Sequence, residues 1–551
     1  MLDEKVTSRL RSLVALSASG AETEQDALAI EQQGDRERER NLKEGVIELW
    51  VTTTAIRLYA DRKGNIGNGV NIAYFIRNNL VEKDWNNRFR IWEVTRNYTA
   101  YDKAHGQALL PRNVFGALYK YIKQINPTVR IVRKKLPCVT PIDVKMKLKQ
   151  KIVPRDHQLP LINFLNKDHE GNSGCHFKPL SASCGSGKTF CTIYSLVHSG
   201  HPSLIVLGFL IDQWYKSILQ FTTIPKDKIY VVQGYDTLAK LIEMGKNGYR
   251  PAIVIFSTRT LVLYAIEKSG MYSTLDDYAT FQKLFGFGTL VHDETHLQFY
   301  ANSQIDLVSN IREVIFLSAT YMRSDFYGQK VFSSIFPEKL IFGGSKTKRY
   351  TTVYMVGYGL EFPTNMDKYF MVPKGYAHSK YENYLMSHTS YLTIFLEKVL
   401  TPLIWQYFLN VKKTKQKCLV LCRTRDFVNC IADNLRHYLA SQHLNIKSYF
   451  AGDKEHGSTK NLEADIIIST SKSCSTGIDI KGLKTLINTV SFASEPQAIQ
   501  TMGRLREIPG DETIFVDLWN AQVSAHHSHK VKRSSAYRSR ALHYSENRIN
   551  Y

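Results

Sequence analysis

The chain has 551 residues, which is too long for one hydrophobic core and suggests roughly three or four domains. Its 43% hydrophobic and 22% charged content is typical of a soluble globular protein. The formal net charge of +22 suggests a polyanionic partner, although a generally solvated basic surface would carry the same charge. No run reaches the roughly 18 apolar residues of a membrane span, and the first residues lack the apolar core of a secretory signal. We therefore expect a cytoplasmic protein with no membrane partner.

The cysteines and histidines do not predict a metal site. Eight cysteines are sparse in so long a chain, and no pair of CxxC elements occurs, which disfavours a disulfide framework or a zinc site. Cys418, Cys422 and Cys430 are interpreted as small residues of a buried strand and the helix after it. The histidines between 526 and 529 are interpreted as part of a solvated polar stretch. Metal binding is the less favoured alternative in both places.

The first 136 residues are predicted to hold a charged tail and a small domain. Residues 1–45 include a mixed-charge run with little apolar content, which predicts a solvated helix or a flexible tail. From residue 46 the pattern changes to short β-rich runs, followed by apolar residues at helical spacing from Val114 to Ile125. We expect a small α+β accessory domain over 46–136.

Two later segments alternate short apolar runs with helical patterns, which predicts parallel sheets covered by helices. The first segment, 137–345, has runs at 203–207, 229–232, 252–256, 289–292 and 314–317. The second, 346–525, has runs at 417–422, 446–450, 465–469, 485–490 and 513–518, with a helical insertion expected over about 358–405. Residues 526–551 are expected to form a basic C-terminal helix or tail. The predicted fold class is α/β, with two tandem parallel-sheet domains after the small α+β domain.

A candidate phosphate-binding loop (P-loop) lies in the first α/β domain. The stretch from Ala182 ends in Gly185, Ser186, Gly187, Lys188 and Thr189. Glycines let backbone N–H groups wrap a polyphosphate, the lysine reaches the β- and γ-phosphates, and the threonine hydroxyl binds Mg²⁺. The general pattern begins with glycine where this chain has alanine, so the last five residues carry most of the prediction.

Two adjacent acids follow an apolar run of the same domain. Asp293 and Glu294 come directly after the run that ends at His292. Asp293 is expected to hold Mg²⁺, directly or through water, and Glu294 to orient and deprotonate the attacking water. An acidic turn that caps a helix is the alternative, but it explains less when a phosphate loop precedes the pair.

In this order the motifs resemble those of the superfamily 2 helicases and translocases of the DExH type, which have two RecA-like domains. Arg155 and Gln158 resemble the adenine-reading segment of that family, so the resemblance implies that the nucleotide is ATP. The segment 210–214 resembles one that touches the nucleic-acid backbone. The resemblance also implies residues that couple the ATP state to nucleic-acid binding, namely His296, Ser318 and Thr320.

The resemblance continues in the second α/β domain as far as residue 506. It implies that Asp479 contacts the nucleotide and that Gly477 and Gln500 couple the two domains. Arg504 is expected to contact phosphate in the transition state. The family's last segment usually reads Q-x-x-G-R-x-x-R, whereas Arg506 follows Arg504 by two residues here. Whether Arg506 acts as the arginine finger is left open.

The accessory domain is similar to the small DNA-binding domain ahead of the motor in phage UvsW-type helicases, through residues 84–86, 89–90 and 110–112. The motor also resembles XPB-like and poxvirus transcript-release helicases. A viral or phage protein of this kind would act in the host-cell cytoplasm or the virion. An accessory domain without nucleic-acid contact is the alternative, in which Trp85 and Trp92 are core residues.

Together the motifs and the charge predict an ATP-dependent helicase or translocase, expected as a monomer. DNA is the expected partner, in branched, duplex or RNA–DNA hybrid form, with RNA also open. A phosphate-loop kinase or GTPase would explain Lys188 and Thr189 but not Gln500 and Arg504. A non-catalytic or weakly catalytic nucleic-acid-binding subunit of a transcription or packaging assembly is the other alternative, supported mainly by the shifted Arg506.

Overall fold

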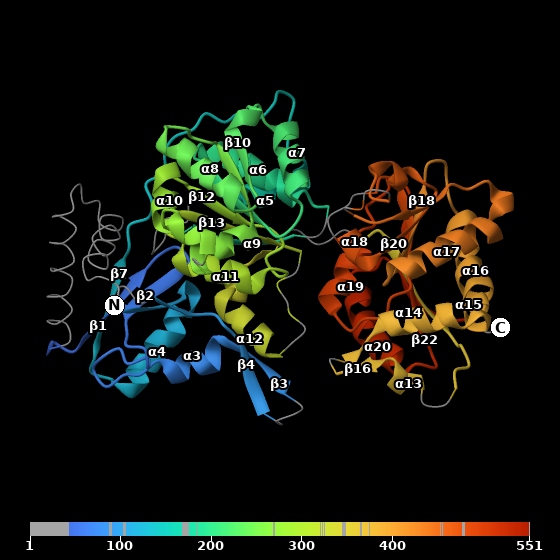
Figure 1. Cartoon of the computed structure of the whole chain (residues 1–551), viewed down its shortest axis with the longest axis horizontal. Coiled ribbons are helices and arrows are strands. Elements are labelled where there is room, and N and C mark those ends of the chain that lie inside the picture. The colour runs from blue at the N-terminus through green and yellow to red at the C-terminus, as the bar shows by residue number, and fades with distance from the viewer. Residues whose placement is uncertain are drawn as a thin grey trace. The chain divides into compact units, whose positions relative to one another are not determined.

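The computed structural model describes residues 43–86, 91–102, 106–167, 176–182, 185–267, 270–319, 321, 323, 326–343, 349–363, 366–373, 375–451, 453, 456–475 and 480–549. The expected N-terminal tail over 1–45 lies almost entirely outside these residues. The chain divides into two compact units, Met1–Ser345 and Lys346–Tyr551 (Figure 1).

The N-terminal part of the first unit is a small α+β region. Its five-stranded sheet has the order β5-β6-β2-β1-β7, with β1 (Val46–Val51), β2 (Ala55–Tyr59), β5 (Ala100–Asp102), β6 (Gln107–Pro111) and β7 (Arg130–Lys135). Two helices accompany it, α3 (Ala73–Asn79) and α4 (Phe115–Ile125). The apolar residues that recur at helical spacing after Val114 form one face of α4, on which Leu118 and Ile122 are buried.

A separate antiparallel hairpin follows α3 and projects past it in Figure 1. It consists of β3 (Val81–Asn86) and β4 (Ile91–Asn97). Every residue of β4 is exposed, and Trp92 keeps 54% of its surface accessible. The alternative in which Trp92 is a core residue is therefore wrong, because more than half of its surface stays accessible on the exposed strand β4. The side chain of Trp85 lies outside the described part of the chain.

The first unit also contains a seven-stranded sheet whose strands are all parallel. Its order is β10-β11-β9-β12-β13-β8-β14, with β8 (His176–Ser181), β9 (Ser203–Leu207), β10 (Ile229–Val232), β11 (Ile253–Ser257), β12 (Thr289–His292), β13 (Glu313–Ser318) and β14 (Phe342–Gly343). Successive residues of β9 enter opposite core clusters, Leu204 on one face and Ile205 on the other. Burial on both faces explains why these strands read as continuous apolar runs.

Helices connect the strands of this sheet. They are α6 (Lys188–Ser199), α7 (Ile211–Phe221), α8 (Tyr235–Lys246), α10 (Tyr278–Phe285), α11 (Phe299–Val308) and α12 (Phe326–Ile335), and α5 (Leu159–Asn166) precedes the first strand, β8. Helices between parallel strands are the usual right-handed crossovers of an α/β fold. The site described below lies where α6 and the segment before α11 leave the sheet.

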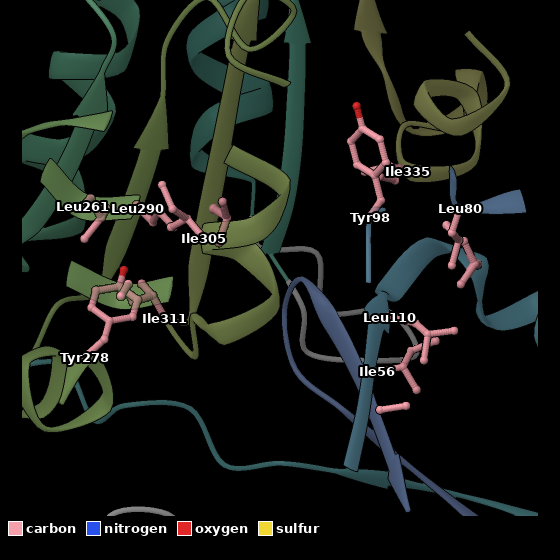
Figure 2. Packing of buried hydrophobic residues seen from close by; sticks show 14 of the residues in the cluster. Ile56, Leu80, Tyr98, Leu110, Leu261, Tyr278, Leu290, Ile305, Ile311 and Ile335 are labelled. Atoms are coloured by element: carbon pink, nitrogen blue, oxygen red, sulfur yellow. The ribbon is translucent and has the colours of Figure 1, made fainter. Parts of the chain in front are cut away.

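The accessory region shares its core with the parallel sheet. One cluster of buried residues includes Ile56 and Leu110 from the accessory sheet and Leu290 and Ile305 from the parallel-sheet domain (Figure 2). The Thr54 hydroxyl donates to the Asp306 carbonyl at 2.7 Å, which adds a polar contact at the same junction. The accessory region and the first parallel sheet therefore form one packed body.

The second unit holds another seven-stranded parallel sheet, ordered β19-β20-β18-β21-β22-β15-β23. Its strands are β15 (Thr351–Tyr358), β18 (Lys417–Cys422), β19 (Ile446–Tyr449), β20 (Ile466–Thr470), β21 (Leu483–Asn488), β22 (Thr513–Asn520) and β23 (Tyr544–Arg548). Within the expected C-terminal segment, α20 (Ser524–Arg538) packs on the sheet and β23 forms its edge. The interpretation of the histidines between 526 and 529 as a solvated stretch is wrong for His526, which is 1% exposed because it packs inside the unit and accepts the Asn520 N–H. The two parallel sheets confirm the predicted α/β class with tandem RecA-like domains.

A long helical run lies in the segment expected as an insertion. The 21-residue stretch Thr389–Leu409 is long and apolar enough to cross a membrane by length and composition alone. Its residues Phe395, Leu400 and Phe408 are buried in the core of the second unit, beside α17 (Arg425–Tyr438). Packing against the sheet therefore explains why one side of this helix is apolar.

Candidate nucleotide-binding site

The candidate phosphate loop connects the end of β8 to the start of α6. Gly185 and Gly187 both have left-handed backbones, with φ of 83° and 85°. This region of backbone space is open to glycine and strained for other residues. Gly187 directly precedes α6, whose first N–H groups have no partner within the helix and face any anion bound there. Ser186 lies between the two glycines, and Thr189 lies in the first turn of the helix.

Lys188, the first residue of α6, has a side chain that fits a phosphate. Its Nζ atom is buried and has no hydrogen-bond partner among the residues that the structure describes. A buried ammonium group without a partner is costly in free energy, so its position favours a bound anion. Burial and Glu294 raise the pKa of Asp293, and the charge of Lys188 opposes this rise, so Lys188 and Asp293 interact electrostatically.

Gln158 lies against the phosphate loop. Its Oε1 atom accepts the Arg155 N–H at 2.9 Å, which fixes the amide plane. A β-carbon added to Gly187 would clash with Gln158 Nε2. Glycine at 187 is therefore required for two reasons, the left-handed backbone and the close approach of this buried amide. Arg155 itself is exposed.

Asp293 follows β12, which lies between β9 and β13 in the sheet. Its carboxylate is buried, and its two oxygens have different partners. Oδ2 accepts the Trp214 indole N–H at 2.8 Å, and Oδ1 accepts the backbone N–H of Glu294 at 2.8 Å. Burial and the neighbouring Glu294 raise the pKa of Asp293 to about 6, while Lys188 opposes the shift. A divalent cation would favour the ionised carboxylate.

Glu294 combines backbone strain with an unpaired carboxylate oxygen. Its φ is 46°, in the left-handed region that L-residues other than Asn and Asp seldom occupy. Oε2 is buried without a hydrogen-bond partner in the described part of the chain, and His296 Nδ1 lies 3.6 Å from it. Strained residues that the surrounding structure holds in place are frequent at functional sites. This geometry suits a general base that accepts a proton from water.

His296 and Ser318 join the turn after β12 to the end of β13. His296 Nδ1 lies 2.8 Å from the Ser318 hydroxyl, and the backbone N–H of Thr295 donates to the Leu317 carbonyl at 2.9 Å. The Ser318 carbonyl accepts the Ala182 N–H at 3.0 Å, so the phosphate loop is tied to the same strand end. Burial, with Lys188, lowers the pKa of His296 to about 4, which makes the imidazole neutral near pH 7.

The structure brings together most of the residues expected from the first α/β domain. Gln158 contacts Gly187, Lys188 interacts with Asp293 and His296, and His296 reaches Ser318. Several expected site residues lie outside the described part of the chain, namely Thr320, Gly477 and Asp479. Their expected roles stay predictions.

Three further expected residues belong to the second unit. Gln500 lies in α19 (Glu495–Met502), and Arg504 and Arg506 follow its C-terminal end. The Arg506 Nη1 atom donates to the Gly503 carbonyl at 2.8 Å, which ties this guanidinium back to the helix end. Arg506, whose spacing from Arg504 departs from the family pattern, is therefore the arginine that makes this local hydrogen bond. Arg504 is half-buried.

Sequence reasoning missed the role of Trp214. The resemblance placed 210–214 against a nucleic-acid backbone, but Trp214 is only 1% exposed and donates to Asp293. Its apolar position one turn before the buried Ile218 on α7 was the available signal for burial. A second missed pair lies beneath the acids, where His292 Nε2 is 2.8 Å from Asp306 Oδ1 and both side chains are buried.

Comparisons with known proteins add little to this description. No protein-family model matches the chain, and no curated protein matches it. A solved structure described as "The crystal structure of T4 UvsW" aligns with 92% of this chain and 99% of that chain, at 15% identity and a TM-score of 0.35. So low a TM-score supports no conclusion about activity or partners. The functional proposal therefore depends on the residues and contacts given above.

Proposed function

We propose that this chain is an ATP-dependent nucleic-acid helicase or translocase that acts on DNA. The observation that carries the proposal is the buried, unpaired ammonium of Lys188 beside the Asp293–Glu294 pair. A polyphosphate would pair with the ammonium group, and a cation would compensate the acids. The order of motifs around this site and the net charge of +22 support the nucleic-acid part.

In this proposal the phosphate loop binds the triphosphate of ATP. The N–H groups at the start of α6 and the Lys188 ammonium hold the phosphates, and Gln158 binds the adenine edge. Thr189 and Asp293 are the residues that would hold Mg²⁺, which neutralises phosphate charge when bound. The hydrogen bonds from Trp214 and from the Glu294 N–H orient the Asp293 carboxylate for that task.

Glu294 is the proposed base for the attacking water. Its unpaired Oε2 is available to accept a proton. His296 is neutral near pH 7, because its pKa of about 4 leaves it unprotonated. It therefore adds no positive charge beside Glu294. Its hydrogen bond to Ser318 connects it to the end of β13.

The second unit is proposed to complete the ATPase. Arg504 would stabilise charge on the transferring phosphoryl group, a role worth roughly 10³–10⁵ in rate in other enzymes. Gln500 and Gly477 would couple closure of the two units to the nucleotide, and Asp479 would contact it. Opening and closing of the two units would then move the chain along nucleic acid, in branched, duplex or hybrid structures.

The proposal is tested by ATP hydrolysis measured with single-stranded, duplex, forked, four-way and RNA–DNA hybrid substrates. All reactions are run at one ionic strength, because phosphate contacts make nucleic-acid affinity salt-dependent. We expect hydrolysis to be stimulated by at least one DNA substrate, with ATP preferred to GTP. Hydrolysis that is indifferent to every DNA and RNA would overturn the proposal, and a strong GTP preference would contradict the role of Gln158.

A further inference from the structure

A buried carboxylate links the accessory hairpin to the motor. Glu82 of β3 is only 6% exposed, and its Oε2 accepts a hydrogen bond from Arg96 Nη1 at 3.0 Å. Its Oε1 accepts the Tyr98 hydroxyl and lies 3.6 Å from Arg323 Nη2. Arg96 and Tyr98 belong to the accessory region, whereas Arg323 follows the end of β13 in the motor. The carboxylate therefore bridges two parts of the first unit.

The same cluster touches α11, the helix that follows the Asp293–His296 turn. The Tyr98 ring packs on Phe299, the first residue of α11, with ring centroids 4.8 Å apart. The Arg323 guanidinium lies over the same Phe299 ring, 5.7 Å from its centroid. Tyr98 and Ile335 of α12 belong to the same cluster of buried residues (Figure 2). Glu82 thus lies at the junction of both segments that leave the candidate site, one after Glu294 and one after Ser318.

Arg323 is close enough to the site to influence it. Burial is the main cause of the lowered pKa of His296, the residue that bonds Ser318, and the charge of Arg323 adds a smaller contribution in the same direction. The Arg323 backbone N–H also donates to Gln329 Oε1 on α12 at 2.5 Å, so Arg323 is held from two directions. A movement of Arg323 would therefore affect both the end of β13, through His296, and α12, through Gln329.

The exposed hairpin offers a place where such a shift could begin. Trp92 of β4 packs edge-on against Tyr327 of α12, with ring centroids 5.0 Å apart. Lys83 of β3 lies 5.6 Å from the centroid of the same Tyr327 ring. Since Tyr327 lies in the first turn of α12, directly after the Arg323 segment, movement of the hairpin would reach that segment through packed side chains.

We propose that Glu82 is a positioning residue that holds Arg323, and that this contact transmits nucleic-acid binding at the accessory region to the ATP site. The inference rests on the proposed function, because it concerns the stimulated part of ATP turnover. The Glu82–Arg323 contact keeps the Arg323 side chain in the position that supports stimulated hydrolysis.

The test compares basal and DNA-stimulated hydrolysis in Glu82→Gln, Arg323→Gln and the double variant. We expect the factor by which DNA raises kcat to fall about tenfold in each single variant, which is an ordinary size for coupling between two sites. Basal kcat and the KM for ATP should stay within about twofold of wild type on the same argument. The double variant should lose no more than either single one, since both remove the same contact. Arg323→Lys, which keeps the charge, should recover part of the stimulation.

Glu93→Gln is the matched control, because Glu93 lies on β4 of the same hairpin and is exposed. It should behave as wild type. If Glu82→Gln does not fold, as judged by its thermal unfolding, the Arg323 variants decide the question, because Arg323 is partly exposed. Wild-type stimulation in Glu82→Gln and Arg323→Gln would overturn the inference and leave the proposed function intact. An equal loss of basal and stimulated rates would also overturn it, since that is the result of a merely structural role. A wild-type enzyme that no nucleic acid stimulates would instead overturn the proposed function.

Discussion

The indole N–H of Trp214 donates to Asp293 Oδ2 at 2.8 Å, and both side chains are buried. The bond joins the start of α7 to the end of β12. A hydrogen bond to a carboxylate favours its charged form, so Trp214 opposes the effect of burial on Asp293. The proposed Mg²⁺ ligand is therefore kept ionisable by a residue that is distant in sequence.

Trp214→Phe should shift the acid side of the pH–rate profile to higher pH. Asp293 must be ionised in the proposed mechanism, so activity is lost as pH falls through its pKa of about 6. Removal of one donor should raise that pKa by roughly one unit, which corresponds to about 1.4 kcal/mol. The measurement is kcat/KM for ATP against pH, because this ratio reports the pKa of the group in the ligand-free protein.

Trp519→Phe is the control for this change. The Trp519 Nε1 atom is buried without a hydrogen-bond partner among the described residues, so the variant removes an indole that donates no such bond. Its pH profile should match wild type. An unshifted acid limb in Trp214→Phe would contradict the role given to the indole.

Gly187→Ala should abolish tight ATP binding. The left-handed φ of 85° disfavours alanine, and the new β-carbon would clash with Gln158 Nε2. Gly200→Ala, at the other end of α6, is the matched control, because its φ is 68° but its β-carbon would meet nothing within 4 Å. We expect both variants to lose about 1 kcal/mol of folding stability from backbone strain. Only Gly187→Ala should lose affinity in a fluorescent-nucleotide titration, and equal affinities would count against the phosphate-loop assignment.

Arg504→Ala should lower kcat far more than Arg506→Ala. Arg504 is the proposed phosphate contact, and loss of an arginine finger costs roughly 10³–10⁵ in rate. Arg506 donates to the Gly503 carbonyl within its own segment, so its removal should chiefly loosen the end of α19. The comparison is made at saturating ATP and DNA. A larger loss in Arg506→Ala would show that Arg506 leaves Gly503 and serves as the finger.

The second unit should lose stability as the pH falls below neutrality. Burial lowers the pKa of His378 to about 3 and of His529 to about 4, and that of His526 also falls. With folded-state pKa values below the ordinary 6.5, the unfolded chain binds more protons between these limits. Stability is therefore present above about pH 6.5 and is lost progressively toward pH 4.

Thermal unfolding followed from pH 8 to pH 4 checks this expectation. His529→Gln should flatten the dependence, because His529 lies 3.0 Å from the Ser491 hydroxyl in this cluster and would no longer titrate. His437→Gln, an exposed position on α17, should leave the curve as in wild type. A curve for His529→Gln as steep as wild type would mean that other groups control the pH dependence.

Much of the fold could be predicted from apolar runs, but the strands β8, β14, β15 and β23 match none of those runs. The runs at 203–207, 229–232 and 289–292 match β9, β10 and β12 because both faces of each strand are buried. β8 was missed because Lys178 and Pro179 interrupt its apolar pattern. The Lys178 ammonium is buried, bonds the Leu165 carbonyl and lies 3.1 Å from Glu313. Pro179 is tolerated because β14 pairs only with Leu180 and Ser181, so Pro179 has a ladder partner on one side.

The candidate site was predictable where motifs are local in sequence. The phosphate loop, Asp293, Glu294 and His296 could be read from short strings. Trp214 and Glu82 could not, because each acts through one long-range contact that no local pattern encodes. The Trp214–Asp293 bond spans 79 positions, and the Glu82–Arg323 contact joins two different regions of the first unit. The roles of Arg504, Gln500 and Asp479 stay predictions.

The central claim is tested most directly by DNA-stimulated ATP hydrolysis in wild type, Lys188→Ala and Glu294→Gln, with ATP binding measured in parallel. We predict that DNA stimulates the wild-type rate and that Glu294→Gln loses roughly 10²–10⁴ in kcat while still binding ATP. Lys188→Ala should lose ATP affinity together with activity. Full hydrolysis by Glu294→Gln, or a wild-type protein that hydrolyses no ATP with any DNA, would contradict the account.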